Sequence, residues 1–145
     1  MKKILSILVL AIVAVQFAFA GDVITKDAKD LPLNARNFIN QYFSKPQISY
    51  IKIDSEFLSK KYEVTLTDRT EIDFDKKGNW TEVDCKKRAV PAALIPASIK
   101  DYVKKNFPNE IITKIERKGT GIEVELANDF SLKFNKKGQF VSMDD

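Results

Sequence analysis

The sequence predicts an α+β fold made of two successive copies of one unit, a helix followed by a four-stranded antiparallel meander. The heptad FDKKGNW at residues 74–80 returns as FNKKGQF at residues 134–140. A proline-led amphipathic segment opens each half, and runs of alternating apolar and polar residues fill the remainder. Because these matches extend over residues 31–145, we expect a tandem duplication.

The first twenty residues have the composition of a cleaved export signal. Lys2 and Lys3 precede an apolar run from Ile4 to Phe19, and Ala18-Phe19-Ala20 supplies the small residues that signal peptidase requires. A membrane-spanning helix needs about 20 apolar residues, so a permanent anchor is disfavoured. We expect cleavage after Ala20, a periplasmic product with no integral membrane segment after cleavage, and an N-terminal lead-in at residues 21–30.

A stripe of apolar residues behind a proline predicts the helix of each half. In the first half, residues 31–84, Pro32 precedes apolar residues at helical spacing, namely Ala35, Phe38, Ile39 and Tyr42. In the second half, residues 95–145, Pro96 precedes Ile99, Tyr102 and Val103. Proline fits the first helical turn, where its missing N–H would have no partner in any case. Pro46 and Pro108 follow the two stripes, and we expect each to end a helix.

Four strands are expected after each helix. Alternation of apolar and polar residues over about five positions is typical of a half-buried antiparallel strand. The expected strands are residues 48–54, 62–66, 71–75 and 80–84 in the first half, and 111–116, 122–126, 130–134 and 140–143 in the second. Residues 85–94 form the linker between the two units.

The repeated heptad can be read as a calcium loop or as a hairpin turn. Asp73, Asp75 and Gly78 are similar to part of a calcium-binding loop, but Lys77 stands where an oxygen ligand is required, and Lys133 replaces Asp73 in the second copy. Glycine permits the positive φ that a short hairpin with a bulge needs. We therefore expect a turn and no metal site.

Composition excludes several classes of function. The chain has no histidine, which removes the commonest general base and transition-metal ligand, and its one cysteine, Cys85, cannot form an internal disulfide. Without Lys2 and Lys3, the chain holds 22 basic and 20 acidic residues, a near balance that argues against a nucleic-acid partner. We expect no cofactor and no catalytic site.

The predicted sheet face opposite the helices is the candidate binding surface. Aromatic and aliphatic residues interleaved with charges are typical of protein-binding patches. Strand parity places ten candidates there: Tyr50, Lys52, Glu63, Glu71, Asp73, Trp80, Glu82, Ile112, Lys114 and Phe140. For Trp80 and Phe140 the alternative is that they cap the core beneath a turn, and both interpretations stay open at this point. Because Lys133 and Ser131 replace Asp73 and Glu71 in the second half, we expect the face to be acidic at one end and milder at the other.

This arrangement resembles the PepSY-like periplasmic proteins of Bacteroidetes, which are similar to β-lactamase inhibitor protein. The match rests on Leu31-Pro32 with Phe38-Ile39, on Ile95-Pro96 with Tyr102-Val103, and on the two heptads. The resemblance implies one curved eight-stranded antiparallel sheet with both helices on one face. In the inhibitor the concave face of the sheet binds an enzyme. The inhibitor also has disulfides that have no counterpart in this chain.

We therefore expect a non-enzymatic periplasmic module that binds an unidentified protein or peptide through the open face of its sheet. Inhibition of a hydrolase or peptidase is one form this binding could take. The alternative is a carrier of a small ligand or an envelope glycan. A third hypothesis is an enzyme that uses the carboxylates of Glu71 and Asp73.

Overall fold

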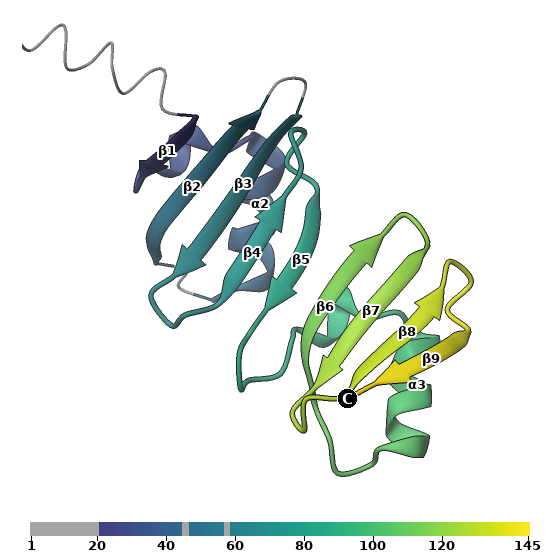
Figure 1. Cartoon of the computed structure of the whole chain (residues 1–145). Helices are drawn as coiled ribbons and strands as arrows, with labels where there is room; N and C mark the ends of the chain where they lie inside the picture. The colour runs from purple at the N-terminus through teal and green to yellow at the C-terminus, as the bar shows by residue number, and fades with distance from the viewer. Residues whose placement is uncertain (1–20, 45–46, 57–58) are drawn as a thin grey trace, which may run out of the picture.

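The computed structural model describes residues 21–44, 47–56 and 59–145. Within these residues, nine strands form one antiparallel sheet in which each strand pairs with the next along the chain (Figure 1). The strands are β1 (Asp22–Thr25), β2 (Ile48–Glu56), β3 (Ser59–Leu66), β4 (Glu71–Phe74), β5 (Trp80–Asp84), β6 (Ile112–Lys118), β7 (Gly121–Leu126), β8 (Ser131–Asn135) and β9 (Phe140–Asp144). The helices are α2 (Leu33–Tyr42) and α3 (Ala97–Asn106), with 3-10 turns η1 (Ala28–Asp30) and η2 (Ala92–Leu94).

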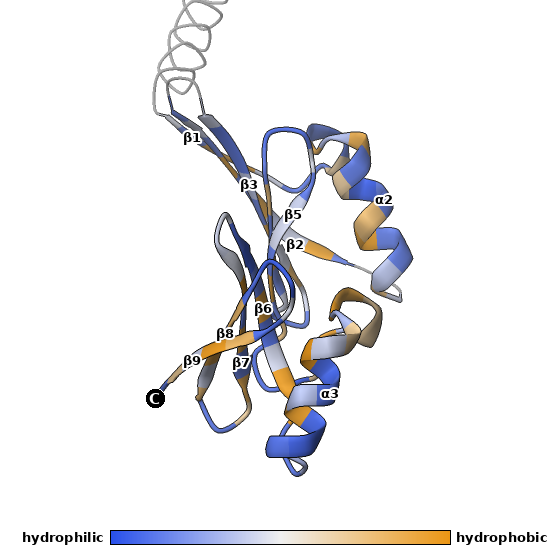
Figure 2. Cartoon of the chain, turned by 90° about the vertical axis from the view of Figure 1, so that its right-hand side faces the viewer, coloured by the Kyte–Doolittle hydropathy of each residue, from blue (hydrophilic) through white to orange (hydrophobic). Residues whose placement is uncertain are grey.

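Both helices lie on the same side of the sheet, as the edge-on view in Figure 2 shows. The predicted α+β class is therefore confirmed, but the predicted count of eight strands is wrong. The additional strand, β1, lies in the segment expected to be a lead-in, where it pairs in register with β2 from Asp22↔Asp54 to Thr25↔Ile51. Four residues are too few to show an alternating pattern in the sequence, whereas the long β2 offers a free edge with which they can pair.

The core lies between the helices and one face of the sheet. A row of buried aliphatic residues crosses the sheet in direct cross-strand register: Ile51, Val64, Ile72, Val83, Ile115, Val124 and Leu132. The pair Val83↔Ile115 joins β5 to β6, so the row passes from one half of the chain to the other without a break. The two halves share one order of elements, a helix followed by four strands. Their origin by duplication stays a prediction.

Each helix is held on the sheet by three aromatic rings. Phe38 of α2 packs edge-on against Phe74 at 5.6 Å between ring centroids and stacks on Trp80 at 5.9 Å. In the second half, Tyr102 of α3 packs edge-on against Phe134 at 5.4 Å and stacks on Phe140 at 4.7 Å. The first and last residues of each heptad are thus the two rings that contact the helix.

Between those rings, each heptad forms a hairpin turn, as predicted. Asp75 Oδ1 accepts hydrogen bonds from the backbone N–H groups of Lys77 and Asn79, and Asn135 Oδ1 does the same for Lys137 and Gln139. Gly78 has a φ of +82°, and a Cβ on it would lie 2.8 Å from the Cβ of Pro32. Glycine is required there for two reasons: other residues are strained at this φ, and a side chain would collide with the start of α2.

The expected export signal at residues 1–20 and the expected helix stop at Pro46 lie outside the described residues. In the part of the chain that the structure describes, no helix is long and apolar enough to cross a membrane.

Candidate functional site

The face of the sheet opposite the helices carries the candidate site, and we call it the open face. Its side chains alternate along each strand with the buried row, and neither helix covers them (Figure 1). Its two central rows, in cross-strand register, contain nine carboxylates: Glu63, Glu71, Asp73, Glu82, Asp84, Glu116, Glu123, Glu125 and Asp144. The same rows contain three lysines: Lys52, Lys114 and Lys133.

Five of the carboxylates stand in direct line on five neighbouring strands. The register pairs Glu63↔Asp73, Asp73↔Glu82, Glu82↔Glu116 and Glu116↔Glu123 link β3 to β7, and we call this line the acidic row. Neighbouring strands are about 4.8 Å apart, and like charges directly opposite one another destabilise a sheet. The acidic row is therefore an arrangement that folding alone does not favour.

Lysines compensate most of the acidic row. Lys52 Nζ lies 3.9 Å from the Glu63 carboxylate, and Lys114 Nζ lies 3.1 Å from the Glu82 carboxylate. Lys118 Nζ lies between two carboxylates, 3.4 Å from Glu116 and 2.6 Å from Glu123. Asp73 is the exception: among residues 21–44, 47–56 and 59–145, it forms no ion pair within 4 Å.

Asp73 is also the most perturbed carboxyl of the open face. Partial burial raises its pKa to about 6, and the negative charges of Glu82, Glu63 and Glu71 add to that rise. Near neutral pH a carboxyl with such a pKa is mostly ionised, at a cost to the folded state. A positive group placed over Asp73 would relieve both the repulsion and the cost.

The acidic row lines part of a shallow hollow of about 290 Å³ on the first half of the open face. Six of the ten predicted site residues line it: Tyr50, Lys52, Glu63, Glu71, Asp73 and Glu82. A seventh, Lys114, stands on the same face, ion-paired with Glu82. The structure thus brings together seven of the predicted residues, and Tyr50 supplies the aromatic member of the group.

The other three predicted residues belong to the helix side. Trp80 stacks on Phe38, Phe140 stacks on Tyr102, and Ile112 is part of the buried core. The cause is a β-bulge at each place. Asp73 pairs with Glu82 but Phe74 pairs with Trp80, which makes Thr81 an extra residue and reverses the side on which Trp80 lies. The same shift occurs between Lys133 and Phe134, and between Ile112 and Lys114.

The acidity of the open face extends further into the second half than the sequence indicated. Glu116, Glu123 and Glu125 continue it across β6 and β7, and it becomes mixed only at β8, where Ser131 and Lys133 stand. The match between Glu123 and Glu63 in the two corresponding strands was the sequence signal that could have predicted acidity in the second half. Glu116 had no such signal, because its partner across the sheet, Glu82, belongs to the other half.

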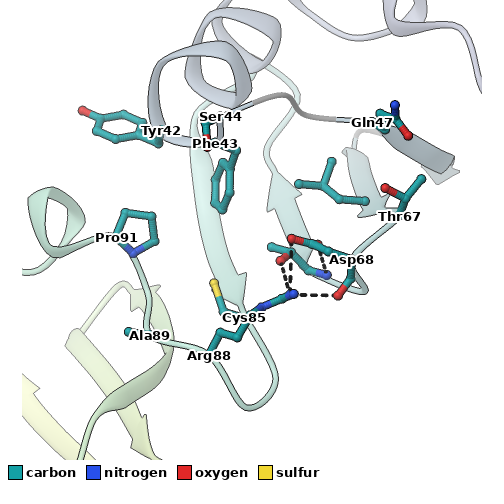
Figure 3. A pocket seen from close by; sticks show the side chains of 12 residues that line it. Tyr42, Phe43, Ser44, Gln47, Thr67, Asp68, Cys85, Arg88, Ala89 and Pro91 are labelled. Atoms are coloured by element: carbon teal, nitrogen blue, oxygen red, sulfur yellow. Dashed lines mark hydrogen bonds and ion pairs between the residues drawn. The ribbon is translucent and has the colours of Figure 1, made fainter.

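A second hollow lies where α2, the β3–β4 turn and the linker meet (Figure 3). Arg88 reaches across it to form an ion pair with Asp68 at 3.4 Å and to donate a hydrogen bond to Thr70 Oγ1. Cys85 is buried beside it, and burial raises the pKa of its thiol. The Arg88 guanidinium is thus already neutralised within the fold, and the thiol is held in its protonated form.

The two carboxylates considered for catalysis, Glu71 and Asp73, have different surroundings on the open face. Lys86 Nζ lies 2.8 Å from Glu71 and 2.9 Å from Asp84, so Glu71, one member of the carboxylate pair considered for catalysis, is already ion-paired. Within the described residues, no group of three or more potential ligands is placed to hold a metal ion. What the arrangement does directly is attract positive charge, because fields of like carboxylates add over a surface.

Comparison with known proteins identifies the family. Residues 60–142 match the family described as "Putative beta-lactamase-inhibitor-like, PepSY-like". The match covers more than half of the chain, and the chain belongs to this PepSY-like family. A search of curated proteins finds no match.

Three solved structures of Bacteroides proteins are similar to this chain. A protein from Bacteroides vulgatus, described as a "putative periplasmic protein of unknown function", is 39% identical, with a TM-score of 0.83, covering 86% of this chain and 100% of its own. A protein from Bacteroides thetaiotaomicron, described as a "putative calcium-regulated periplasmic protein", is 43% identical, with a TM-score of 0.81, covering 86% and 97%. A further Bacteroides vulgatus protein, described as a "putative periplasmic protein", is 35% identical, with a TM-score of 0.81, covering 88% of this chain and 99% of its own.

Proposed function

We propose that this chain is a non-enzymatic periplasmic binding module whose open face engages a protein or peptide. The acidic row carries the proposal. Five carboxylates stand in line across five strands, and lysines pair with four of them. The fifth, Asp73, lines the hollow and has no ion-pair partner within 4 Å among the described residues. Folded proteins keep such unfavourable arrangements mainly where they serve a function.

The charge of the open face defines the chemistry of the partner. Five lysines stand against the nine carboxylates of the central rows of this face, namely Lys52, Lys114 and Lys133 within the rows and Lys86 and Lys118, which pair with row members from outside them. The remaining excess of negative charge favours a partner whose contact surface is rich in lysine or arginine. Tyr50 at the hollow adds an aromatic side chain of the kind that anchors protein interfaces. Inhibition of a hydrolase or peptidase is the form of binding for which we would test first, since the family takes its description from an inhibitor.

The periplasmic location rests on the basic and apolar N-terminal twenty residues and on the periplasmic description of the three structural relatives. We propose that residues 1–20 are removed on export and that residues 21–145, which hold every described element, form the working protein.

The test is affinity capture with a charge-matched control. Immobilised protein would be exposed to envelope extract from its source organism, and the retained proteins identified by mass spectrometry. The test variant is Glu63→Gln/Asp73→Asn/Glu82→Gln, which removes three negative charges from the open face. The control variant removes the same number elsewhere, by Asp101→Asn/Glu110→Gln/Asp129→Asn.

We expect a basic partner that is retained by the wild type and the control but lost by the open-face variant. Equal retention by both variants would exclude the open face as the binding surface. Hydrolytic turnover that disappears in Glu71→Gln would contradict the non-enzymatic part of the proposal.

A further inference from the structure

A second surface is exposed where the sheet ends, at β9. This strand pairs with β8 on one side, and its other edge is the end of the sheet. Val141 is 62% exposed and Met143 is 48% exposed, and hydrophobic residues colour much of β9 in Figure 2. Sheet edges are usually protected from pairing by lysine or proline, and the β9 sequence FVSMD contains neither.

In the first half of the fold, the strand that corresponds to β9 is β5, and a further strand pairs with its outer edge. β5 and β9 hold the same place, each following a heptad turn and a β-bulge. Val83 pairs with Ile72 on β4 as Met143 pairs with Leu132 on β8. The outer edge of β5 pairs with β6, and Val83 is 0% exposed there. Met143 is half exposed because, within the part of the chain that the structure describes, no strand lies beyond β9.

We propose that the outer edge of β9 accepts an extended peptide of a partner protein as an additional antiparallel strand, in the register by which β5 accepts β6. Main-chain hydrogen bonds supply most of the affinity in such strand addition, and alternate side chains supply the selectivity. This inference does not rest on the open face, since it concerns a different surface.

The β5–β6 pairing also indicates which peptide sequence fits. Ile115 lies opposite Val83, and Lys114 lies opposite Asp84. On β9 the corresponding positions are Met143 and Asp144, so the incoming strand should place an apolar residue beside Met143 and a basic residue beside Asp144. Lys133 already pairs with Asp144, as Lys86 pairs with Asp84 on β5, where Lys114 of β6 still lies opposite. The Lys114-Ile115 dipeptide of β6 meets both conditions.

A peptide fits this edge better than a second copy of the chain does. Pairing β9 with β9 would join two five-residue strands, and a stable protein–protein interface buries about 1,200–2,000 Å² in total. A single short strand added at an edge falls well below that area. Recognition of a peptide segment does not require so large a buried area, because strand-addition domains bind short peptides reversibly.

The experiment is an NMR titration of residues 21–145 with the synthetic peptide ITKIERK, the sequence of β6. We expect saturable shifts concentrated in the amides of residues 140–144, with a dissociation constant on the order of 1 mM or tighter. A peptide with proline in place of the central isoleucine keeps the same charge but cannot pair fully, and should bind at least tenfold more weakly. That control separates strand addition from attraction of a basic peptide to the open face.

Two protein variants locate the site. Met143→Lys places a charge on the β9 edge and should weaken binding at least fivefold, whereas Val23→Lys, at an equally exposed position (48%) on the opposite edge strand β1, should leave it unchanged. Absence of shifts at residues 140–144 at several millimolar peptide would overturn the proposal. Equal binding of the proline peptide, or shifts confined to the open face, would overturn it as well. Concentration-dependent shifts at β9 without peptide would assign the edge to self-association and contradict the proposed occupant.

Discussion

Replacing Asp73 with asparagine should stabilise the protein at neutral pH. Partial burial and the charges of Glu82, Glu63 and Glu71 raise the pKa of Asp73 to about 6, from an ordinary value of 3.8. The folded state therefore binds a proton more tightly than the unfolded state does. Stability contributed by this group is present below pH 3.8 and is lost as pH rises towards 6.

The pKa shift of Asp73 sets the upper limit of the stabilisation that Asp73→Asn can bring. A difference of about two pKa units corresponds to about 3 kcal/mol, and solvent screening at a partly exposed carboxyl reduces it to about 1–2 kcal/mol. Asparagine has nearly the same shape and carries no charge. Asp73→Asn should thus raise the free energy of unfolding at pH 8 by about 1–2 kcal/mol, or raise Tm by roughly 3–8 °C.

Urea unfolding followed by circular dichroism between pH 4 and pH 8 would measure this. The wild type should lose stability across pH 4–6 at this site, and the variant should lose less. Glu123→Gln is the matched control, because Glu123 is already paired with Lys118 at 2.6 Å and its removal brings no gain. An unchanged pH profile in Asp73→Asn, or an equal gain in Glu123→Gln, would show that the ionised Asp73 carboxylate does not destabilise the folded state.

Three further predictions concern the fold. Arg117→Ala should lower the free energy of unfolding by about 1–2 kcal/mol, because the guanidinium lies 4.1 Å from the Trp80 ring centroid and donates a hydrogen bond to the Trp80 carbonyl. Urea denaturation would measure the change, and an unchanged midpoint would contradict the prediction. Gly78→Ala should cost about 1–3 kcal/mol because of its φ of +82° and the 2.8 Å contact, whereas Gly119→Ala, with open space around the added Cβ, should be near neutral. The Cys85 thiol, buried and with a raised pKa, should react with iodoacetamide at pH 8 far more slowly in the folded protein than in urea; equal rates would contradict its burial.

Much of the fold could be predicted because local patterns in this sequence agree with one another. The heptads carry a turn glycine between two aromatic residues, and the structure uses both features, the glycine against the start of a helix and the rings against its side. The short β1 was missed because its pairing depends on the free edge of β2, which no local pattern of four residues reveals.

The candidate site was predicted in part, and β-bulges explain the errors. Alternation correctly placed Tyr50, Lys52 and the first-half carboxylates on one face. One extra residue at Thr81 moved Trp80 to the helix side, and the shift beside Ile112 did the same in the second half. A period of two cannot reveal a bulge, because the bulge is itself the break in that period.

Site-specific photo-crosslinking in envelope extract would show directly whether the open face binds a partner. A photoreactive phenylalanine would replace Thr65, which lines the hollow on the open face, and in a separate protein Asn37, which is exposed on the outer side of α2. If the open face binds the partner, position 65 should crosslink to it, salt should suppress that crosslink because the contact is electrostatic, and position 37 should give no crosslink. Crosslinks from position 37 with none from position 65 would show that the partner binds the helix side of the sheet and not the open face.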